Sequence, residues 1–188
     1  MKREYRRSEP LFSQCGLNCG LCPMYHIREE SHCPGCGGPG RPSCPLLRCA
    51  GEHGGVEFCS LCPDWPCQRY VQEQADSFIP HRNARRDLET VKRVGLEHYR
   101  ETLGKKMEGL RFLLERCNDG RRKSLFCTAV NLLELEDVEA VIARLEGEVG
   151  PEDPPEEQKD RGSRAAELFR ERAQTRGVSL KLERQRKP

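Results

Sequence analysis

The stretch CGLNCGLCPMY (residues 15–25) opens a segment that carries ten of the twelve cysteines in this 188-residue chain. All ten lie between Cys15 and Cys67, a density typical of folds held together by disulfides or by metal rather than by a large apolar core. Their spacings are C-x3-C-x2-C, C-x2-C, C-x4-C and C-x2-C-x4-C. The ten are Cys15, Cys19, Cys22, Cys33, Cys36, Cys44, Cys49, Cys59, Cys62 and Cys67.

Metal ligation explains these thiols better than disulfide formation. Disulfides need an oxidising compartment, and the leading residues MKREYRRSEPLF (1–12) lack the apolar core of a secretory signal. We therefore expect a cytoplasmic protein with reduced cysteines. Two thiolates separated by two residues can turn toward one ion, and the neighbouring glycines allow the tight backbone turn that this requires.

The count of ten leaves the grouping of the ligands open. One grouping is three, four and three, in which Cys33, Cys36, Cys44 and Cys49 form an all-thiolate site. Each outer triad then needs a fourth ligand, for which His26, His32 and His53 are the candidates within the segment. In the alternative, cysteines from the two ends of the segment share sites, and two sites of four thiolates each leave two cysteines unused.

Zinc in structural sites is the first expectation for the metal, because C-x2-C turns and mixed cysteine and histidine sets suit this ion. A [4Fe-4S] cluster in a redox or accessory enzyme is the alternative, since close cysteine triads and cysteines followed by proline also occur in iron–sulfur proteins. The C-x3-C-x2-C spacing is shared with radical SAM enzymes, but the chain shows no alternation of strands and helices that their barrel requires.

The cysteine segment resembles a prokaryotic family catalogued as domain of unknown function 3795. The resemblance rests on CGLNCGLCPMY (15–25), CPGC (33–36), CPLLRCA (44–50) and GVEFCSLCPDWPC (55–67), and continues more weakly through GRRKSLFCTAVNLL (120–133). It implies a small protein with a metal-binding N-terminal half and the ten cysteines as ligands. It implies no reaction and no catalytic residue.

After Cys67 the sequence becomes helical. We expect a short helix over Gln68–Phe78 and a second over Ala84–Val94, capped by Asn83 and stopped by Gly95. Apolar residues from Tyr99 to Cys117 recur at helical spacing, and Ser124–Leu133 is apolar on two faces, as in a buried helix. Another helix is expected from Asp137. Cys117 and Cys127 are expected to be buried core thiols.

The C-terminal part is expected to contain a linker, a charged helix over Ser163–Arg176 and a short strand over Val178–Leu182. The predicted regions are 1–70 (cysteine-rich), 71–146 (helical core), 147–162 (linker) and 163–188 (helix plus strand). The fold class expected is an irregular cysteine-rich metal-binding N-terminal half packed on a mainly α-helical C-terminal half, with few short strands.

Composition narrows the function classes. The net charge is +2, the mean hydropathy is −0.78, and no run of about 18 apolar residues exists, so we expect no membrane-spanning helix. Basic clusters at 82–86 and 121–123 make a zinc-knuckle nucleic-acid-binding protein the second alternative, although interleaved acidic residues favour a salt-bridged surface. No catalytic motif is present. Trp65 is expected to cover a metal site. The sequence leaves open whether the protein binds another protein.

Overall fold

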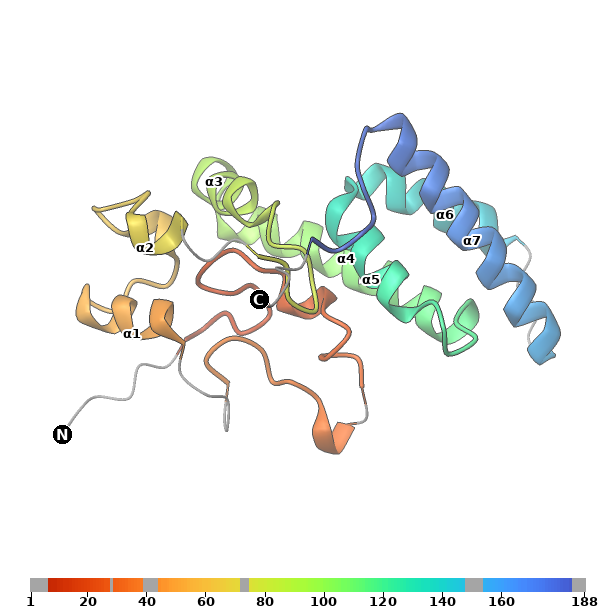
Figure 1. Cartoon of the computed structure of the whole chain (residues 1–188), viewed down its shortest axis with the longest axis horizontal. Coiled ribbons are helices and arrows are strands. Elements are labelled where there is room, and N and C mark those ends of the chain that lie inside the picture. Colours follow the sequence, from red (N-terminus) through yellow and green to blue (C-terminus); the bar gives the residue numbers. More distant parts are fainter. Residues whose placement is uncertain (1–6, 28, 39–43, 72–74, 148–153, 184–188) are drawn as a thin grey trace. The chain divides into compact units, whose positions relative to one another are not determined.

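The structure, a computed structural model, describes residues 7–27, 29–38, 44–71, 75–147 and 154–183. The chain divides into two compact units. The N-terminal unit comprises Met1–Arg100 with Glu183–Pro188, and the C-terminal unit comprises Glu101–Leu182. The described residues form seven α-helices and three short 3-10 turns and contain no strand (Figure 1). The mainly helical expectation is therefore confirmed, whereas the expected strand over Val178–Leu182 is wrong.

The cysteine-bearing segment has little regular structure, as the sequence predicts. Its 3-10 turns are Cys19–Leu21, Glu29–Ser31 and Cys59–Leu61, and its helices are α1 (Pro45–Glu52) and α2 (Gln68–Val71). The predicted helix over Gln68–Phe78 is thus much shorter than expected. Residues 72–74 lie outside the described residues, and 75–79 form bends.

A small aromatic core holds this segment together. Phe12 is 2% exposed, and its ring centroid lies 5.2 Å from that of Phe58 and 4.6 Å from that of Tyr99. The guanidinium of Arg7 lies 5.4 Å from the centre of the Phe58 ring, and its Nη2 atom donates to the carbonyl of Phe12 at 2.9 Å. The core therefore ties the first described residues to the middle of the unit and to Tyr99 in helix α4 (Leu96–Arg116).

Helix α3 (Ala84–Val94) has the predicted bounds and ends at Gly95, whose φ of +86° suits glycine. Asn83 occupies the N-cap position, but its side chain makes no capping hydrogen bond. Its Nδ2 atom instead donates to Asp87 Oδ2 at 2.7 Å. The capping role expected for Asn83 is therefore replaced by an interaction within the first turn of α3.

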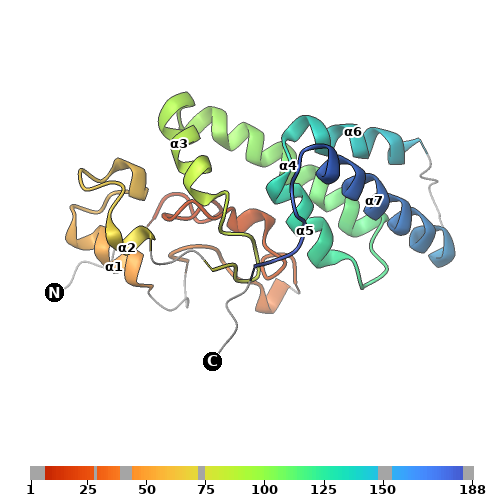
Figure 2. The same cartoon turned by 45° about the horizontal axis from the view of Figure 1, so that its top comes forward.

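Helix α4 (Leu96–Arg116) carries the predicted apolar stripe and spans the boundary between the two units. The C-terminal unit then adds α5 (Lys123–Leu132), α6 (Leu135–Glu146) and α7 (Pro155–Thr175). Phe126 to Leu132 in α5 are all buried, as expected for a helix that is apolar on two faces. Helices α6 and α7 lie side by side in Figures 1 and 2.

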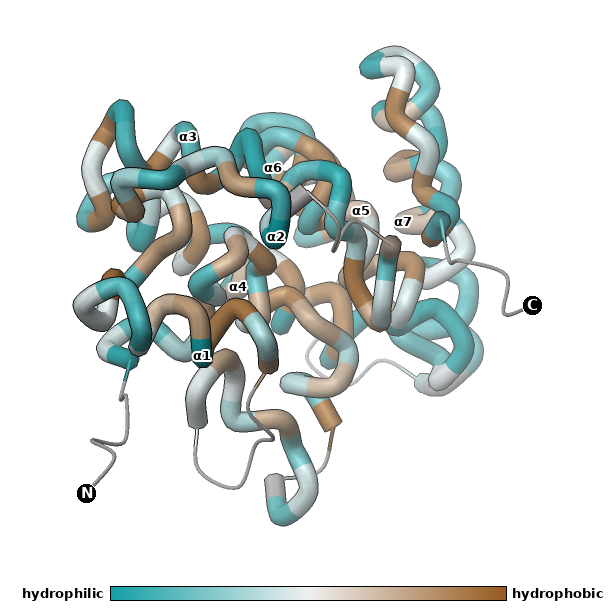
Figure 3. Tube along the Cα trace, turned by 60° about the vertical axis from the view of Figure 1, so that its left-hand side comes forward, coloured by the Kyte–Doolittle hydropathy of each residue, from teal (hydrophilic) through white to brown (hydrophobic). Residues whose placement is uncertain are grey.

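Helix α7 begins at Pro155, inside the region that the sequence predicts as a linker. Apolar positions recur along it between hydrophilic ones (Figure 3), and Ala165, Ala166, Phe169 and Ala173 are buried. Arg176, which follows α7, donates to the buried carboxylate of Asp137 at 2.8 and 3.2 Å. No helix of the described residues is both long and apolar enough to span a bilayer.

Candidate metal centre

The ten clustered cysteines are all partly buried, and none of the twelve cysteines is joined in a disulfide. Eight of the ten line two cavities in the N-terminal unit. The larger cavity is lined by Cys15, Cys19, Cys36 and Cys44, and the smaller by Cys49, Cys59, Cys62 and Cys67. We call these four-residue groups the large set and the small set. Cys22 and Cys33 line neither cavity.

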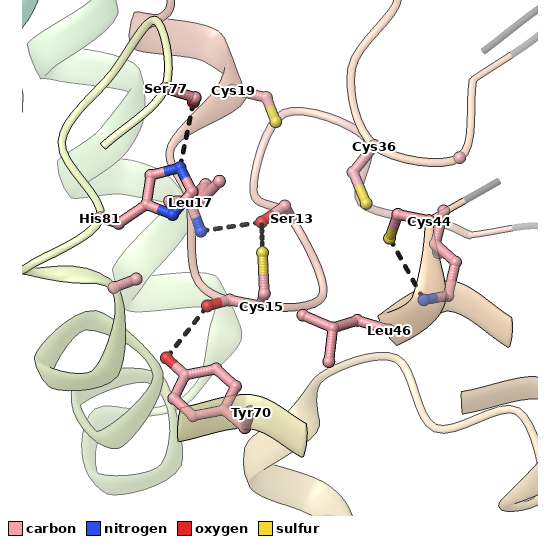
Figure 4. A pocket seen from close by; sticks show the side chains of 13 residues that line it. Ser13, Cys15, Leu17, Cys19, Cys36, Cys44, Leu46, Tyr70, Ser77 and His81 are labelled. Atoms are coloured by element: carbon pink, nitrogen blue, oxygen red, sulfur yellow. Dashed lines mark hydrogen bonds between the residues drawn. The ribbon is translucent and has the colours of Figure 1, made fainter. Parts of the chain in front are cut away.

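The larger cavity has a volume of about 260 Å³. Figure 4 shows the four sulfur atoms of the large set facing the same region, two from the loop that carries Cys15 and Cys19 and the others from the segments of Cys36 and Cys44. Three of them have polar neighbours. Cys44 Sγ accepts from the backbone N–H of Leu47 at 3.4 Å, Cys36 Sγ accepts from Arg7 Nη1 at 3.4 Å, and Cys15 Sγ lies 3.1 Å from Ser13 Oγ.

A buried polar network positions the loop that carries Cys15 and Cys19. Between the two cysteines, Asn18 donates from Nδ2 to Asp87 Oδ2 at 3.0 Å and accepts from the hydroxyl of Tyr99 at 2.9 Å. Tyr70 donates to the carbonyl of Cys15 at 3.2 Å. These contacts fasten the loop to α3, to α4 and to the end of the cysteine segment, so the sulfur positions are set by the whole unit.

The smaller cavity has a volume of about 20 Å³. The turn Cys59–Leu61 presents Cys59 and Cys62, and the N–H of Cys62 donates to the carbonyl of Cys59 at 3.1 Å. The turn Cys19–Leu21 has the same arrangement. Trp65 also lines the smaller cavity, and its ring packs edge-on against Tyr70 at 4.4 Å. This placement agrees with the covering role expected for Trp65.

His53 stands beside the smaller cavity and is accompanied by an acid that the sequence did not single out. His53, Cys62 and Asp64 offer ligand atoms that all lie within 4.8 Å of one another. Within the part of the chain that the structure describes, they are the only such group of three or more cysteine, histidine or acidic residues. Asp64 directly follows Cys62 and Pro63 in the sequence, and this closeness to a cysteine is the feature that could have marked it as a candidate site residue.

The imidazole of His53 has a different neighbour on each nitrogen. Its Nδ1 atom lies 2.8 Å from the carbonyl oxygen of Cys49 and 3.6 Å from Cys49 Sγ, while Nε2 lies 3.4 Å from Asp64 Oδ2. With its proton on Nδ1, His53 donates a hydrogen bond to the carbonyl of Cys49 and leaves Nε2 able to bind a metal, an arrangement common for metal-binding histidines. His26 and His32 are placed elsewhere, with both rings against Tyr25.

Burial keeps several of these thiols protonated while no cation is bound. It raises the pKa of Cys15 from 9.0 to about 11 and that of Cys59 to about 12, and the neighbouring thiols add to the increase at Cys59. Burial also raises the pKa of Cys19 well above its usual value, and Cys36 and Cys15 contribute more to that increase than Cys22 and Cys33. A bound cation reverses this preference because it favours the thiolate.

The cysteines line the two cavities in a different division from the grouping of three, four and three. Cys44 stands at the start of α1 and lines the larger cavity, whereas Cys49, inside the same helix, lines the smaller one. The helix therefore sends the two cysteines of the C-x4-C pair to different cavities. Two groups of four with two cysteines over is the arrangement that the cavities show.

The remaining candidate residues have structural surroundings. Cys117 and Cys127 are 0% and 1% exposed, which confirms the prediction of buried core thiols. In the basic clusters, Arg82 pairs with Asp76, Arg85 with Glu89, and Arg122 with Asp119. These ion pairs agree with a salt-bridged surface and reduce the charge available for a nucleic acid.

Comparisons with known proteins returned no match. No family model, no curated protein and no solved structure is similar to this chain.

Proposed function

We propose that this protein is a metal-binding protein whose N-terminal unit is built around ions held by cysteine thiolates, with zinc in the smaller cavity. The observation that carries the proposal is the convergence of eight free cysteines on two cavities within one unit. Close free thiols that are not joined in disulfides are the usual ligands of zinc and of iron–sulfur clusters. We also propose that the ten cysteines have the metal-binding role implied by the family that they resemble.

Zinc suits the smaller cavity for two reasons. A volume of about 20 Å³ has space for one water-sized object and therefore for a single ion. The residues around it also offer the ligand types that zinc prefers, namely the small set of thiols and the imidazole of His53. Asp64 can hydrogen-bond the imidazole or replace a ligand at the exposed side of the site.

The proposed role of the metal is structural. Residues 7–38 hold only two three-residue 3-10 turns among their described positions, so this segment has almost no regular secondary structure, and its backbone hydrogen bonds are those of turns and loops. Structural zinc contributes apparent binding free energies of about 10 kcal/mol or more, and this energy becomes folding energy when the site forms only in the folded chain. Ion binding would therefore supply the stability that the small aromatic core lacks.

A chelator experiment on the full chain tests this proposal. Protein purified without oxygen should contain zinc, and removing it should lower the melting temperature and change the circular dichroism spectrum. Cys59→Ser and Cys67→Ser should lose zinc, whereas Cys22→Ser, which changes a cysteine outside both cavities, should keep it. Zinc-free protein with unchanged melting would refute the proposal, and so would full zinc occupancy in the Cys59→Ser and Cys67→Ser variants.

A further inference from the structure

We infer that the larger cavity binds a [4Fe-4S] cluster through the large set, Cys15, Cys19, Cys36 and Cys44. The inference rests on the proposed function, because it takes the N-terminal unit to be a metal-binding module. It adds that the two cavities hold different metal groups. The observations that distinguish the two cavities are their volumes and the polar groups that surround the large set.

Volume is the first difference between the cavities. The larger cavity measures about 260 Å³ and the smaller about 20 Å³. A single ion with four thiolates closes around itself and leaves no space, whereas a cubane of four irons and four sulfides has the bulk of a small ligand. The larger cavity therefore has room for a cluster, and a lone zinc ion would leave most of it unfilled.

The spacing of the sulfurs agrees with the volume. Tetrahedral zinc with bonds of about 2.3 Å places its thiolates about 3.8 Å apart. In the described residues no three thiols of the large set lie within 4.8 Å of one another. A cubane holds its four thiolates farther apart, because irons and sulfides stand between them. The small set is equally open, so spacing supports the cluster only together with volume.

The polar neighbours of the large set suit a group with negative charge. A cluster with four thiolates carries net negative charge, and hydrogen bonds to its sulfurs stabilise that charge. Arg7 has a fully buried side chain that pairs with Glu57 through Nη2 and reaches Cys36 Sγ through Nη1. The N–H of Leu47 reaches Cys44 Sγ. The hydroxyl of Ser13 lies against Cys15 Sγ. These contacts already stand where cluster ligands would need them.

The backbone near Cys36 is shaped for a close approach. Gly35 and Gly37 on either side of Cys36 have φ values of +91° and +76°, and Gly37 lines the cavity. A Cβ atom at Gly35 would lie 2.2 Å from the carbonyl oxygen of Pro10, so a side chain does not fit there. The N–H of Cys36 donates to the same carbonyl at 2.8 Å. Cys36 is therefore held in a tight turn at the cavity wall.

Cys22 and Cys33 provide a competing assignment that an experiment can separate. They stand in the C-x2-C pairs with Cys19 and Cys36. A site built from two such pairs would use Cys22 and Cys33 in place of Cys15 and Cys44. Cys15 and Cys44 line the larger cavity and are therefore the ligands that we assign. Substitutions of these two cysteines should remove the cluster, whereas substitutions of Cys22 and Cys33 should leave it bound.

The test uses full-length protein purified without oxygen and then mixed with a preformed synthetic [4Fe-4S] thiolate complex. The four cysteine thiols replace the four small thiolates on iron, and each cysteine proton leaves with a displaced thiolate as free thiol, so no oxidant or reductant is needed. We expect about four irons and four sulfides per chain and absorption near roughly 400 nm. Cys15→Ala and Cys44→Ala should each lose most of the iron and the colour. Cys22→Ala and Cys33→Ala should keep both.

The zinc content of each variant shows whether it has folded, since the small set is unchanged in all four. A colourless wild-type chain with zinc at both cavities would overturn the cluster assignment and leave the proposed function intact. Colour retained in Cys15→Ala and Cys44→Ala but lost in Cys22→Ala and Cys33→Ala would also overturn it. Iron without zinc would support the cluster and refute only the zinc proposal for the smaller cavity.

Discussion

Single glycines decide how closely the loop of Cys15 and Cys19 approaches helix α3. Gly16 has a φ of +89°, and a Cβ atom built on it would lie 2.2 Å from the carbonyl oxygen of Ala84. Backbone cannot move away from such a contact without shifting either the loop or the helix. The glycine is therefore required both by its backbone conformation and by the space around it.

Gly16→Ala should destabilise the N-terminal unit by more than about 2 kcal/mol, because the cost of positive φ and the clash with α3 add. Gly54→Ala is the matched control, since Gly54 has a φ of +81° and a Cβ atom there would have no neighbour within 4 Å. Denaturant unfolding of the metal-loaded protein measures both variants. Equal losses of stability would show that the close approach of loop and helix contributes nothing.

Helix packing in the C-terminal unit depends on glycine in a different way. Gly162 lies inside α7, and a Cβ atom there would stand 2.2 Å from the carbonyl oxygen of Cys117. Gly104 lies inside α4 and has open space around it. The first glycine permits contact between two backbones, and the second only lowers the helix propensity of α4.

The two substitutions should therefore have opposite signs. Gly104→Ala should stabilise the protein by up to about 1 kcal/mol, since alanine is the better helix former. Gly162→Ala should destabilise it, because the added methyl group meets backbone that cannot rotate away. Thermal melting of the two variants beside the wild-type chain gives the comparison. A gain in stability for Gly162→Ala would contradict the packing of α7 against the end of α4.

The same elements show what the sequence could predict. Periodic apolar residues identified α4 and α5, because a helix face repeats at a spacing that a sequence displays directly, and Asn83 and Gly95 marked the ends of α3. The start of α7 was missed because prolines and acidic residues near 151–157 are typical of a linker. In the structure Pro155 occupies the first helical position, where a backbone N–H would have no partner within the helix, so proline is tolerated there. The expected strand at 178–182 rested on only five alternating residues.

For the whole molecule, the ten cysteines were identifiable as a group, but their division between the cavities was not. Spacing relates cysteines that are near in sequence, whereas the cavities collect cysteines from distant segments. Cys49 lines the same cavity as Cys67 because helix α1 separates it from Cys44. Asp64 lies close to His53 although the two are eleven positions apart in the sequence. Such groupings depend on the path of the loops, and a single sequence does not encode that path in any local pattern.

Proton release gives a prediction about zinc binding to the whole protein. Burial raises the pKa of Cys59 from 9.0 to about 12, so this thiol is protonated at neutral pH in the metal-free fold. Zinc needs the thiolate, so binding expels the proton and the apparent affinity should fall as the pH falls. The decrease is about tenfold per pH unit for each proton released. Competition with a chromophoric chelator between about pH 8 and 6 measures it. An affinity that does not change with pH would exclude buried thiols as ligands.

X-ray absorption at the zinc edge of anaerobically purified, full-length protein tests the central claim most directly, because it reports the atoms bound to the ion. Thiolate ligation by the small set predicts a shell of three or four sulfurs at about 2.3 Å, with at most one imidazole nitrogen. A shell of only nitrogen and oxygen at about 2.0 Å, or protein that contains no metal, would contradict a fold built on metal–thiolate bonds.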